Sequence, residues 1–314
     1  MKKFVYKILY LIVLPLLLFG LVYEGLARKV PNVYAYKNGW MAKNASSVKI
    51  LNLGSSHGYF GISPSVFSDK AFNCAHESQD LVYDCFIFSK FFDNMDSLQV
   101  LILPISYRTF FEKGIEFSDE HWRVKYYCIY YECPYHSSEL VFNSEFYSDL
   151  CCRDIHIAGL AKSAFSDEQP ELKWDELGKG IRNRTEVRDS IWWENNGKVR
   201  AKYHSRAINY LVVANNMEYV ENIVEKCRKK NIQVLMVTIP AYKTYRDNLN
   251  QNQLGIMVDC CHLFEEQHDN VCYLNLLSDD RFDITDYSDS DHLNEKGAEK
   301  LTLILQQTID SLEY

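Results

Sequence analysis

Two short motifs, far apart in the chain, carry the residue types of a nucleophile and of the base that would activate it. Gly54-Ser55-Ser56-His57 closes an apolar run near the start of the chain, and Asp289-Ser290-Asp291-His292 stands shortly before its end. A serine hydroxyl is a weak nucleophile until a neighbouring base takes its proton, and an imidazole oriented by a carboxylate is the usual base. The two motifs together predict a triad of Ser56, His292 and Asp289.

The spacing within each motif has a mechanical reason. Ser56 follows the β-rich run 48–53, so we expect it at the carboxyl end of a strand, where open α/β sheets place their chemistry. Asp289 precedes His292 by three positions, so one turn of chain can bring the carboxylate beside the imidazole and select its tautomer. A purely structural interpretation stays open, in which Ser56 caps a helix and the aspartates belong to a solvated acidic loop.

On these residues the chain resembles the SGNH (GDSL-like) hydrolase superfamily, in particular its membrane-anchored members that act on envelope polysaccharide. The resemblance covers residues 48–312, interrupted by one insertion. The segments that carry it are Gly54-Ser55-Ser56, Phe72-Asn73-Cys74-Ala75, Thr238-Ile239-Pro240, Asp289-Ser290-Asp291-His292-Leu293-Asn294 and Gly297-Ala298. The chain is also similar to the proteins of lipoteichoic acid D-alanylation and, more loosely, of alginate O-acetylation. The resemblance implies that Ser56 is the nucleophile and that Asp289 and His292 complete the triad.

The oxyanion hole implied by the resemblance departs from the family pattern. Family members usually carry a Gly-x-Asn-Asp segment after the third strand, whereas here the strand 98–103 runs into Pro104-Ile105-Ser106-Tyr107. The resemblance implies backbone donors at Ser56 and Ala75, with Ala75 in place of the second glycine and Ser106 in place of the asparagine. Loss of one oxyanion donor typically costs ~10²–10³ in turnover.

Further residues beside the two motifs are expected to line the site. His57 follows the nucleophile too closely in the chain to reach it as a base, so we expect it in the lining. The full set of expected oxyanion or lining residues is Gly54, Ala75, Asn73, Ser106 and His57. Other candidates for the cleft are His76, Tyr242 and Tyr245, for which capping or packing is an equal interpretation.

The first thirty residues predict export of the rest of the chain. Lysines precede an uncharged run at 8–23, which is long enough to span a membrane if Leu26 and Ala27 extend it past Glu24. The segment either remains as a membrane anchor or is removed as a signal peptide, because Gly25-Leu26-Ala27 resembles a small-x-small cleavage site. A buried core helix is the third interpretation. The first two place Ser56 outside the cytoplasm.

Strand and helix patterns alternate along the rest of the chain. The expected strands are 48–53, 71–74, 98–103, 232–238 and 271–276, and the expected helices are 78–92, 206–230, 245–266 and one capped by Asn294. This alternation predicts an α/β fold, a flavodoxin-like three-layer α/β/α sandwich with a five-stranded parallel sheet. The resemblance implies strand order 2-1-3-4-5. The expected organisation is an anchor or signal peptide at 1–30, a linker at 31–47 and the catalytic domain at 48–314.

A long insertion follows the third strand, at about residues 106–204, where a standard fold needs only one helix. It is expected to be mainly helical and is rich in aromatic residues. Aromatic faces pack on sugar rings, so some of these residues are candidates for glycan contact, with ordinary packing as the alternative. They are Trp122, Tyr126, Tyr127, Tyr130, Tyr131, Tyr135, Trp174, Trp192 and Trp193.

The charge of the chain argues against nucleic acid as a partner. The net charge is −8, and the sequence displays no concentrated basic face that would neutralise phosphates. The small basic cluster Lys179, Arg182, Arg184 and Arg188 is either a solvated loop or a contact for acidic polysaccharide. No cofactor is expected, because Gly54, Gly58 and Gly61 lack the dinucleotide-binding spacing.

Ten cysteines in an exported chain suggest that some pair, and their connectivity stays open. Those clustered in sequence are Cys128, Cys133, Cys151 and Cys152, whereas Cys74, Cys85, Cys227 and Cys272 are expected as buried hydrophobic residues. No metal is expected, because the adjacent cysteines near His156 and His262 cannot easily fill the corners of a tetrahedral site.

The expected function is that of an SGNH-type serine O-acyl esterase or O-acyltransferase on capsular or envelope polysaccharide outside the cytoplasm. Its expected partners are an acylated polysaccharide or other ester, the membrane through the N-terminal helix, and a membrane-bound O-acyltransferase. The alternative is a noncatalytic polysaccharide-assembly subunit that keeps the fold and binds glycan or the acyltransferase. A lipid-ester hydrolase at the membrane surface is a third interpretation.

Overall fold

The structure is a computed structural model that describes residues 2–28, 30–133, 173–182 and 188–312. It divides into two compact units, one formed by Met1–Asn38 with Asp119–Leu172 and the other by Gly39–Ser118 with Lys173–Tyr314. The sheet and every predicted site residue belong to the second unit.

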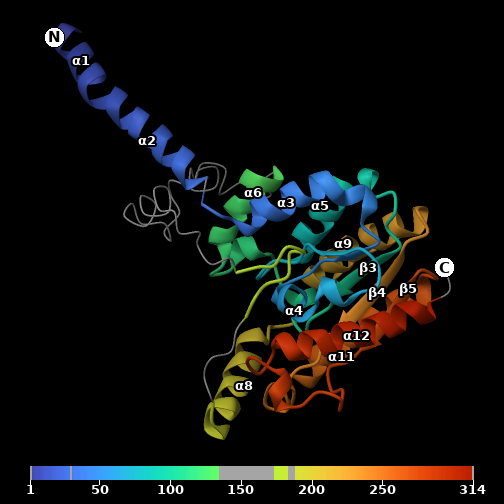
Figure 1. Ribbon diagram of the computed structural model, residues 1–314. Helices are drawn as coiled ribbons and strands as arrows, with labels where there is room; N and C mark the ends of the chain where they lie inside the picture. Colours follow the sequence, from blue (N-terminus) through green and yellow to red (C-terminus); the bar gives the residue numbers. More distant parts are fainter. Residues whose placement is uncertain (1, 29, 134–172, 183–187, 313–314) are drawn as a thin grey trace. The chain divides into compact units, whose positions relative to one another are not determined.

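A five-stranded parallel sheet forms the centre of the second unit (Figure 1). Its strands are β1 (Ile50–Asn52), β2 (Ala71–Asn73), β3 (Val100–Pro104), β4 (Gln233–Thr238) and β5 (Val271–Asn275). Their order is β2-β1-β3-β4-β5, and every neighbouring pair is parallel. The predicted fold class, strand set and strand order are therefore confirmed, and the carboxyl ends of all five strands meet at one edge.

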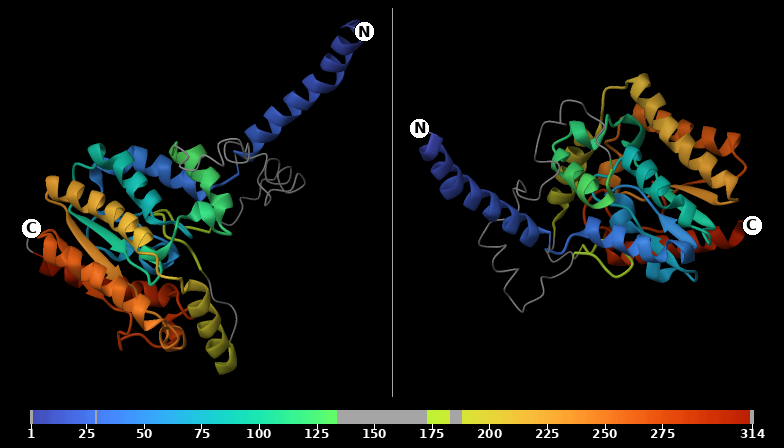
Figure 2. Two further views of the ribbon diagram at one scale, coloured as in Figure 1. Left: turned by 180° about the vertical axis from the view of Figure 1, so that it is seen from behind. Right: turned by 90° about the horizontal axis from the view of Figure 1, so that it is seen from above.

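Two layers of helices cover the sheet, as Figure 2 shows. On one face α4 (Ser56–Gly61) packs with α12 (Glu295–Ser311). On the other, α5 (Leu81–Phe91) packs with α9 (Tyr210–Lys229), and α11 (Gln251–Gln267) lies against β5. The helices that connect parallel strands lie on the faces of the sheet, and together they bury both faces.

The core under α12 follows the period-two pattern of the strands. Alternate strand residues meet the apolar stripe of the helix, namely Ile50, Val100, Ile102, Leu235 and Val237 with Leu301, Ile304, Leu305 and Ile309. The predicted cap of α12 is confirmed, because the Asn294 side chain accepts the N–H of Gly297 at 3.0 Å. Leu312 follows the last residue of this helix and is half-buried.

Helix boundaries differ from the expectation where an asparagine or aspartate caps the chain. Asp80 caps α5 at Leu81, and Asn209 caps α9 at Tyr210, so both helices begin later than predicted. The single helix expected at 245–266 is two helices, α10 (Lys243–Arg246) and α11, because the Asn250 side chain accepts N–H groups of a new first turn. A side-chain cap of this kind competes with continuing the preceding helix.

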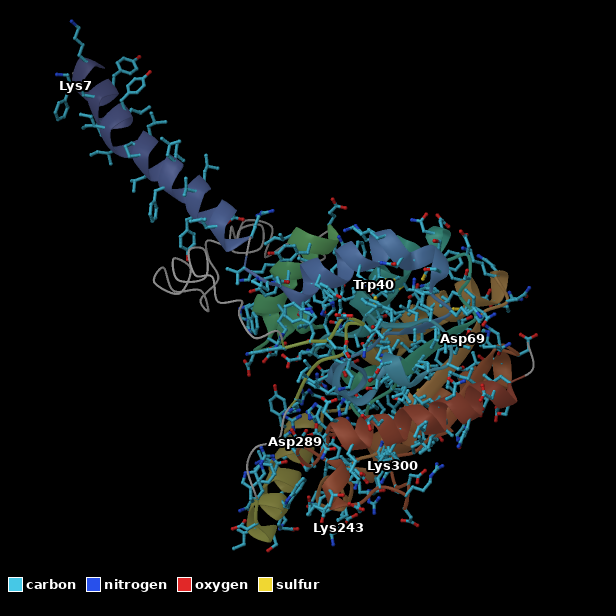
Figure 3. All side chains as sticks on the ribbon, in the orientation of Figure 1. Lys7, Trp40, Asp69, Lys243, Asp289 and Lys300 are labelled. Atoms are coloured by element: carbon cyan, nitrogen blue, oxygen red, sulfur yellow. The ribbon has the colours of Figure 1, made fainter. Side chains whose placement is uncertain are left out.

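The segment 31–47, predicted as a linker, is folded. It contains α3 (Val33–Asn44) and the 3-10 turn η2 (Ala45–Ser47). The Trp40 ring, labelled in Figure 3, stacks on Phe72 of β2 with centroids 3.8 Å apart, and Met41 is fully buried. The stacking of Trp40 on Phe72 holds the part of α3 that belongs to the second unit against β2.

The described part of the insertion contains short 3-10 turns and two helices. The turns are η5 (Thr109–Phe111), η6 (Ile115–Phe117) and η7 (His121–Arg123), and the helices are α6 (Val124–Tyr131) and α8 (Ser190–His204). Tyr127, Tyr131 and Trp193 are buried, so these three pack in the interior and are not available to a glycan. Tyr135, Cys151, Cys152, His156 and Arg184 lie outside the described residues.

In the first unit, one long apolar helical segment is formed by α1 (Lys2–Ile8), the π-helical turn η1 (Leu9–Val13) and α2 (Leu14–Ala27). Within it, Tyr6–Leu26 has 21 residues and a mean hydropathy of 2.1. A helix rises 1.5 Å per residue, so such a segment is about 30 Å long, the thickness of a bilayer's hydrocarbon core. Length and composition suit a membrane span and a signal sequence equally well.

Helix α8 packs closely on α10, and a substitution at the point of contact tests this packing. A Cβ built on Gly197 would lie 2.1 Å from the backbone oxygen of Thr244. We expect Gly197→Ala to destabilise the fold by ~1–3 kcal/mol, because the two backbones would have to separate. The matched control is Gly255→Ala in α11, where a Cβ meets nothing within 4 Å.

In the control, helix propensity alone should stabilise the protein by ~0.5–1 kcal/mol. Urea unfolding of both variants measures the two effects. Equal midpoints for Gly197→Ala and the unsubstituted protein would contradict the close approach of α8 and α10.

Candidate active site

The predicted nucleophile stands at the carboxyl edge of the sheet. Ser56 is the first residue of α4 and follows β1 after a turn at Gly54, whose φ is +101°. A Cβ on Gly54 would also lie 3.2 Å from Cδ of Pro104, so both conformation and space favour glycine. The buried Asp84 of α5 fixes this turn, because its Oδ1 accepts the Gly54 N–H at 2.7 Å. Gly54 therefore acts on the site through the backbone.

The structure brings the three predicted triad residues together. Ser56 Oγ lies 2.9 Å from His292 Nε2, and His292 Nδ1 lies 2.9 Å from Asp289 Oδ1. With Nδ1–H donated to the carboxylate, Nε2 is left to accept the serine proton. Asp289 Oδ1 also accepts the backbone N–H of His292 at 2.9 Å, so the local turn holds the carboxylate in place. Asp289 stands just ahead of α12 (Figure 3).

Charges around the imidazole favour its protonated form. Burial lowers the pKa of His292, but the carboxylates of Asp289 and Asp291 outweigh burial and raise it to about 9. For Asp289, burial raises the pKa, but the neighbouring His292 and Arg182 lower it below its ordinary value. Arg182, from the predicted basic cluster, donates to Asp289 Oδ2 at 2.7 Å and is partly exposed. One member of that cluster is thus part of the site.

His57, which the sequence predicts to line the site, lies beside the triad base. Its ring stacks on that of His292, with centroids 4.8 Å apart and an interplanar angle of 14°. Burial lowers the pKa of His57, so two stacked imidazoles need not both carry charge. The neutral His57 ring therefore leaves the positive charge to His292.

The second predicted oxyanion donor is already engaged. The N–H of Ala75 donates to Oδ1 of Asn73 at 3.0 Å. Asn73 itself is fully buried, and its Nδ2 donates to the carbonyls of Gly58 at 2.9 Å and Ile62 at 3.1 Å. The expectation of Asn73 as an oxyanion or lining residue is therefore wrong, because its amide is used to hold α4. Ser56 begins α4, where a helix leaves its first N–H groups without an internal acceptor.

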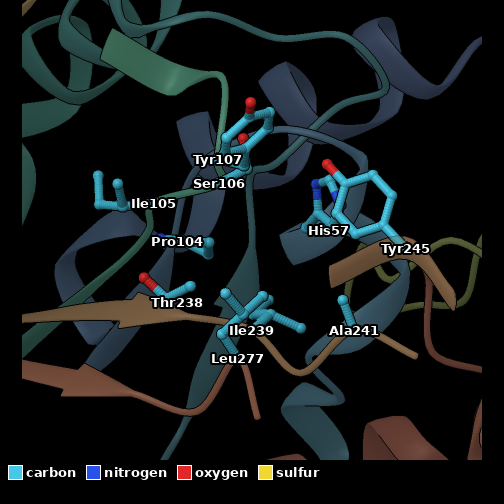
Figure 4. Close-up of a pocket in the computed structure, with 10 residues that line it drawn as sticks. All are labelled: His57, Pro104, Ile105, Ser106, Tyr107, Thr238, Ile239, Ala241, Tyr245 and Leu277. Carbon is cyan, nitrogen blue, oxygen red and sulfur yellow. The ribbon is translucent and has the colours of Figure 1, made fainter. Parts of the chain in front are cut away.

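A small cavity of about 20 Å³ lies beside His57 at the ends of β3 and β4 (Figure 4). It is lined by His57, Pro104, Ile105, Ser106, Tyr107, Thr238, Ile239, Ala241, Tyr245 and Leu277. Ser106 and Tyr245, both singled out from the sequence, belong to this lining. The Ser106 hydroxyl pairs with Thr109 Oγ1 at 2.9 Å, so the residue in the family's asparagine position is held within its own turn.

Sequence reasoning missed the groups that surround Asp291. This aspartate is inside the motif, yet nothing in its spacing distinguishes it from a solvated loop residue. In the structure it is fully buried, and Arg200 of α8 donates to both of its oxygens at 2.8 and 2.6 Å. His204, also of α8, lies 3.8 Å from the same carboxylate. An alternation of polar residues along 196–204 was the available signal, but it identifies no partner.

The side chains of His57, Asp291 and His292 are close enough to surround an ion, but they fit a metal poorly. Both oxygens of Asp291 are bonded to the Arg200 cation, and the two nitrogens of His292 face Ser56 and Asp289. A ligand set must offer free lone pairs to the metal, and a guanidinium in the same place repels one. The bonding of this cluster therefore supports acid–base chemistry.

Comparison with known proteins gives structural neighbours only. No family model matches the chain, and no curated protein matches it. Similar solved structures include a candidate acylhydrolase from Bacteroides fragilis, at 10% identity and TM-score 0.41, covering 88% of this chain and 96% of that chain. A candidate platelet activating factor from Streptococcus pneumoniae has 10% identity and TM-score 0.40, covering 95% and 97%.

A GDSL-like lipase from Bacteroides thetaiotaomicron has 8% identity and TM-score 0.41, covering 89% of this chain and 98% of that chain. Similarity of this degree leaves the substrate open.

The raised pKa of His292 predicts an alkaline activity profile. His292 must be neutral to accept the serine proton. The rate of reaction at Ser56 should therefore rise with pH, and the midpoint of that rise should lie at about 9. The measurement is the rate of labelling by a fluorophosphonate probe between about pH 6 and 10. A midpoint near 6.5, the ordinary value for histidine, would show that the two carboxylates do not hold charge on the imidazole.

Proposed function

We propose that this protein is a serine-dependent ester hydrolase or acyltransferase that uses Ser56, His292 and Asp289. The observation that carries the proposal is the continuous hydrogen-bonded path from Ser56 Oγ through His292 to Asp289, with both links at 2.9 Å. All three groups stand at the carboxyl edge of a parallel sheet, the usual position for chemistry in this architecture.

In the proposed reaction, Ser56 Oγ attacks the carbonyl carbon of an ester while His292 Nε2 takes the hydroxyl proton. The tetrahedral intermediate collapses when the C–O bond to the leaving alcohol breaks and His292 returns the proton to that oxygen. A second hydroxyl, deprotonated by His292, then attacks the acyl-enzyme and frees Ser56. Water in this step gives hydrolysis, and a sugar hydroxyl gives transfer.

We further propose that the substrate is an O-acylated polysaccharide of the envelope or capsule, met outside the cytoplasm. Support comes from the N-terminal segment Tyr6–Leu26, which is long and apolar enough to hold the chain at a membrane. Arg182 and Arg188 lie by the Asp289 loop, where Arg182 pairs with Asp289 and Arg188 donates to the Ser288 carbonyl, and their guanidinium groups are of the type that contacts acidic glycan. A membrane-bound O-acyltransferase is the proposed partner where the reaction is transfer.

A noncatalytic role in polysaccharide assembly is the second candidate function. The observation that favours it is the Ala75 N–H, which donates to Asn73 and so leaves Ser56 as the sole free donor of the expected pair. Ser106, in the asparagine position, is bonded to Thr109. An oxyanion that is held by only one of the two expected donors is stabilised poorly, so a subunit of this kind would bind glycan without turning it over.

Covalent labelling decides between the two candidates. We expect the full-length protein in detergent to react with a fluorophosphonate probe at one site, and Ser56→Ala to lose the labelling entirely. The control is Ser65→Ala, because Ser65 is exposed and lies outside the site. Turnover of acetylated polysaccharide should fall by on the order of 10⁶ in Ser56→Ala, as for other serine nucleophiles.

Absence of labelling in the folded, unsubstituted protein would reject an active serine. Glycan binding that is equal in the unsubstituted protein and in Ser56→Ala, with no ester turnover in either, would establish the assembly role.

A further inference from the structure

Helix α8 of the insertion faces the Asp289–His292 loop with three polar side chains spaced four residues apart. Asn196 Oδ1 accepts the N–H of Ser290 at 3.1 Å and its hydroxyl at 2.6 Å. Arg200 donates to both oxygens of Asp291, and His204 bonds to the Tyr245 hydroxyl at 2.8 Å beside the same carboxylate. Residues at i, i+4 and i+8 share one face of a helix, so α8 engages the loop along a continuous edge.

Two carboxylates compete for one N–H of the triad base. Asp289 Oδ1 lies 2.9 Å from His292 Nδ1, and Asp291 Oδ1 lies 3.5 Å from the same nitrogen. A neutral imidazole has a single N–H on that side, so only one carboxylate can accept it with good geometry. The choice sets the direction of the ring, and with it the alignment of Nε2 on Ser56.

Arg200 removes Asp291 from this competition. Its Nε and a terminal nitrogen make two charge-assisted bonds to the two oxygens, the strongest pairing available to a carboxylate in proteins. Asp291 is fully buried, so its charge needs such a partner, whereas the Arg200 side chain is 31% exposed and keeps contact with solvent. With both oxygens bonded to Arg200, Asp291 is held with its Oδ1 3.5 Å from His292 Nδ1, longer than a good hydrogen bond to that nitrogen.

The other groups near Asp291 do not replace Arg200. His57 and His204 face it at 3.6 and 3.8 Å, and burial lowers the pKa of both, to about 2 for His204. Arg108 acts on these histidines from a distance, and Arg182 is paired with Asp289. In the described part of the chain, the lysine or arginine that pairs with Asp291 is therefore Arg200.

We propose that Arg200 is a positioning residue that holds Asp291 away from His292, so that Asp289 remains the partner of the triad base. This inference rests on the proposed function of Ser56. Without Arg200, Asp291 can accept the Nδ1–H and turn the ring, and its uncompensated charge stabilises the protonated imidazole. Both effects slow proton transfer from Ser56, and both require a charged Asp291.

A double-mutant cycle tests this dependence in the full-length protein. Arg200→Gln should slow fluorophosphonate labelling at pH 7 by at least about tenfold and move the rise of rate with pH to higher pH by about one unit. Asp291→Asn should label at least as fast as the unsubstituted protein at pH 7, because it removes the competitor and one of the two carboxylates that raise the pKa of His292. The decisive variant is Arg200→Gln/Asp291→Asn, which should label as fast as Asp291→Asn alone.

Additive losses in the double variant would overturn the proposal, since they would show that Arg200 acts without Asp291. The matched control is Lys202→Gln, which removes an exposed cation from the same helix and should label like the unsubstituted protein. Arg200→Lys should recover part of the rate, because one ammonium can satisfy the charge but not both oxygens at once.

A spectroscopic readout keeps the test independent of activity and of folding losses. In Ser56→Ala protein with isotope-labelled histidine, NMR titration follows His292 directly, and the folded signals report whether each variant is intact. Addition of Arg200→Gln should raise the pKa of His292, and further addition of Asp291→Asn should reverse the rise. No change in His292 titration would overturn the proposal. Absent labelling in the unsubstituted protein would instead reject the proposed function.

Discussion

The site depends on keeping two neighbouring carboxylates, Asp289 and Asp291, buried and charged in one short loop. A buried charge without partners costs several kcal/mol, and two of the same sign also repel. The loop meets this demand with donors from several directions: its own backbone N–H groups and Arg182 for Asp289, and Arg200 for Asp291. The imidazole of His292 lies near both carboxylates. Its position, tautomer and charge follow from how these donors divide the oxygens.

The nucleophile is supported in the same manner from the opposite side of the site. Asp84 accepts the Gly54 N–H, and Asn73 donates to the carbonyls of α4 while accepting the Ala75 N–H. Asp84 is only 2% exposed, and this burial raises its pKa to about 7. Ser56 thus rests on buried polar bonds, each of which must be satisfied for the turn to keep its shape.

The sequence was sufficient for features that are set locally or by topology. Apolar runs located all five strands, and the chain's two motifs, at opposite ends of the alternation, placed Ser56 beside the Asp289–His292 pair. Caps at Asp80, Asn209 and Asn250 moved helix starts, because a side-chain oxygen competes with the backbone in a way that periodicity does not register. The packing of Trp40 on Phe72 depends on a contact between separate elements of the second unit.

The partners of the site residues could not be predicted from the sequence either, because they also depend on contacts between distant parts of the chain. Arg200 and Asp291 are 91 positions apart, and the residue pattern of one helix cannot say which loop its polar side chains will meet. Asn73 looked like a site residue by its position, yet its amide satisfies buried carbonyls. The aromatic residues of the insertion divide likewise, since Trp193 is part of the core and only burial reveals it.

Helix α8 makes the insertion a structural part of the site and not only a lid placed over it. Asn196 and Arg200 bond to the loop that bears the base, and Gly197 lets the helix sit directly on α10. A shortened chain that joined β3 to β4 by a single standard helix would still contain Ser56, Asp289 and His292. It would lose the counter-charge and the backbone contacts that hold them. The smallest functional unit of this protein is therefore larger than its sheet and triad, and α8 cannot be exchanged as a module without rebuilding the loop it supports.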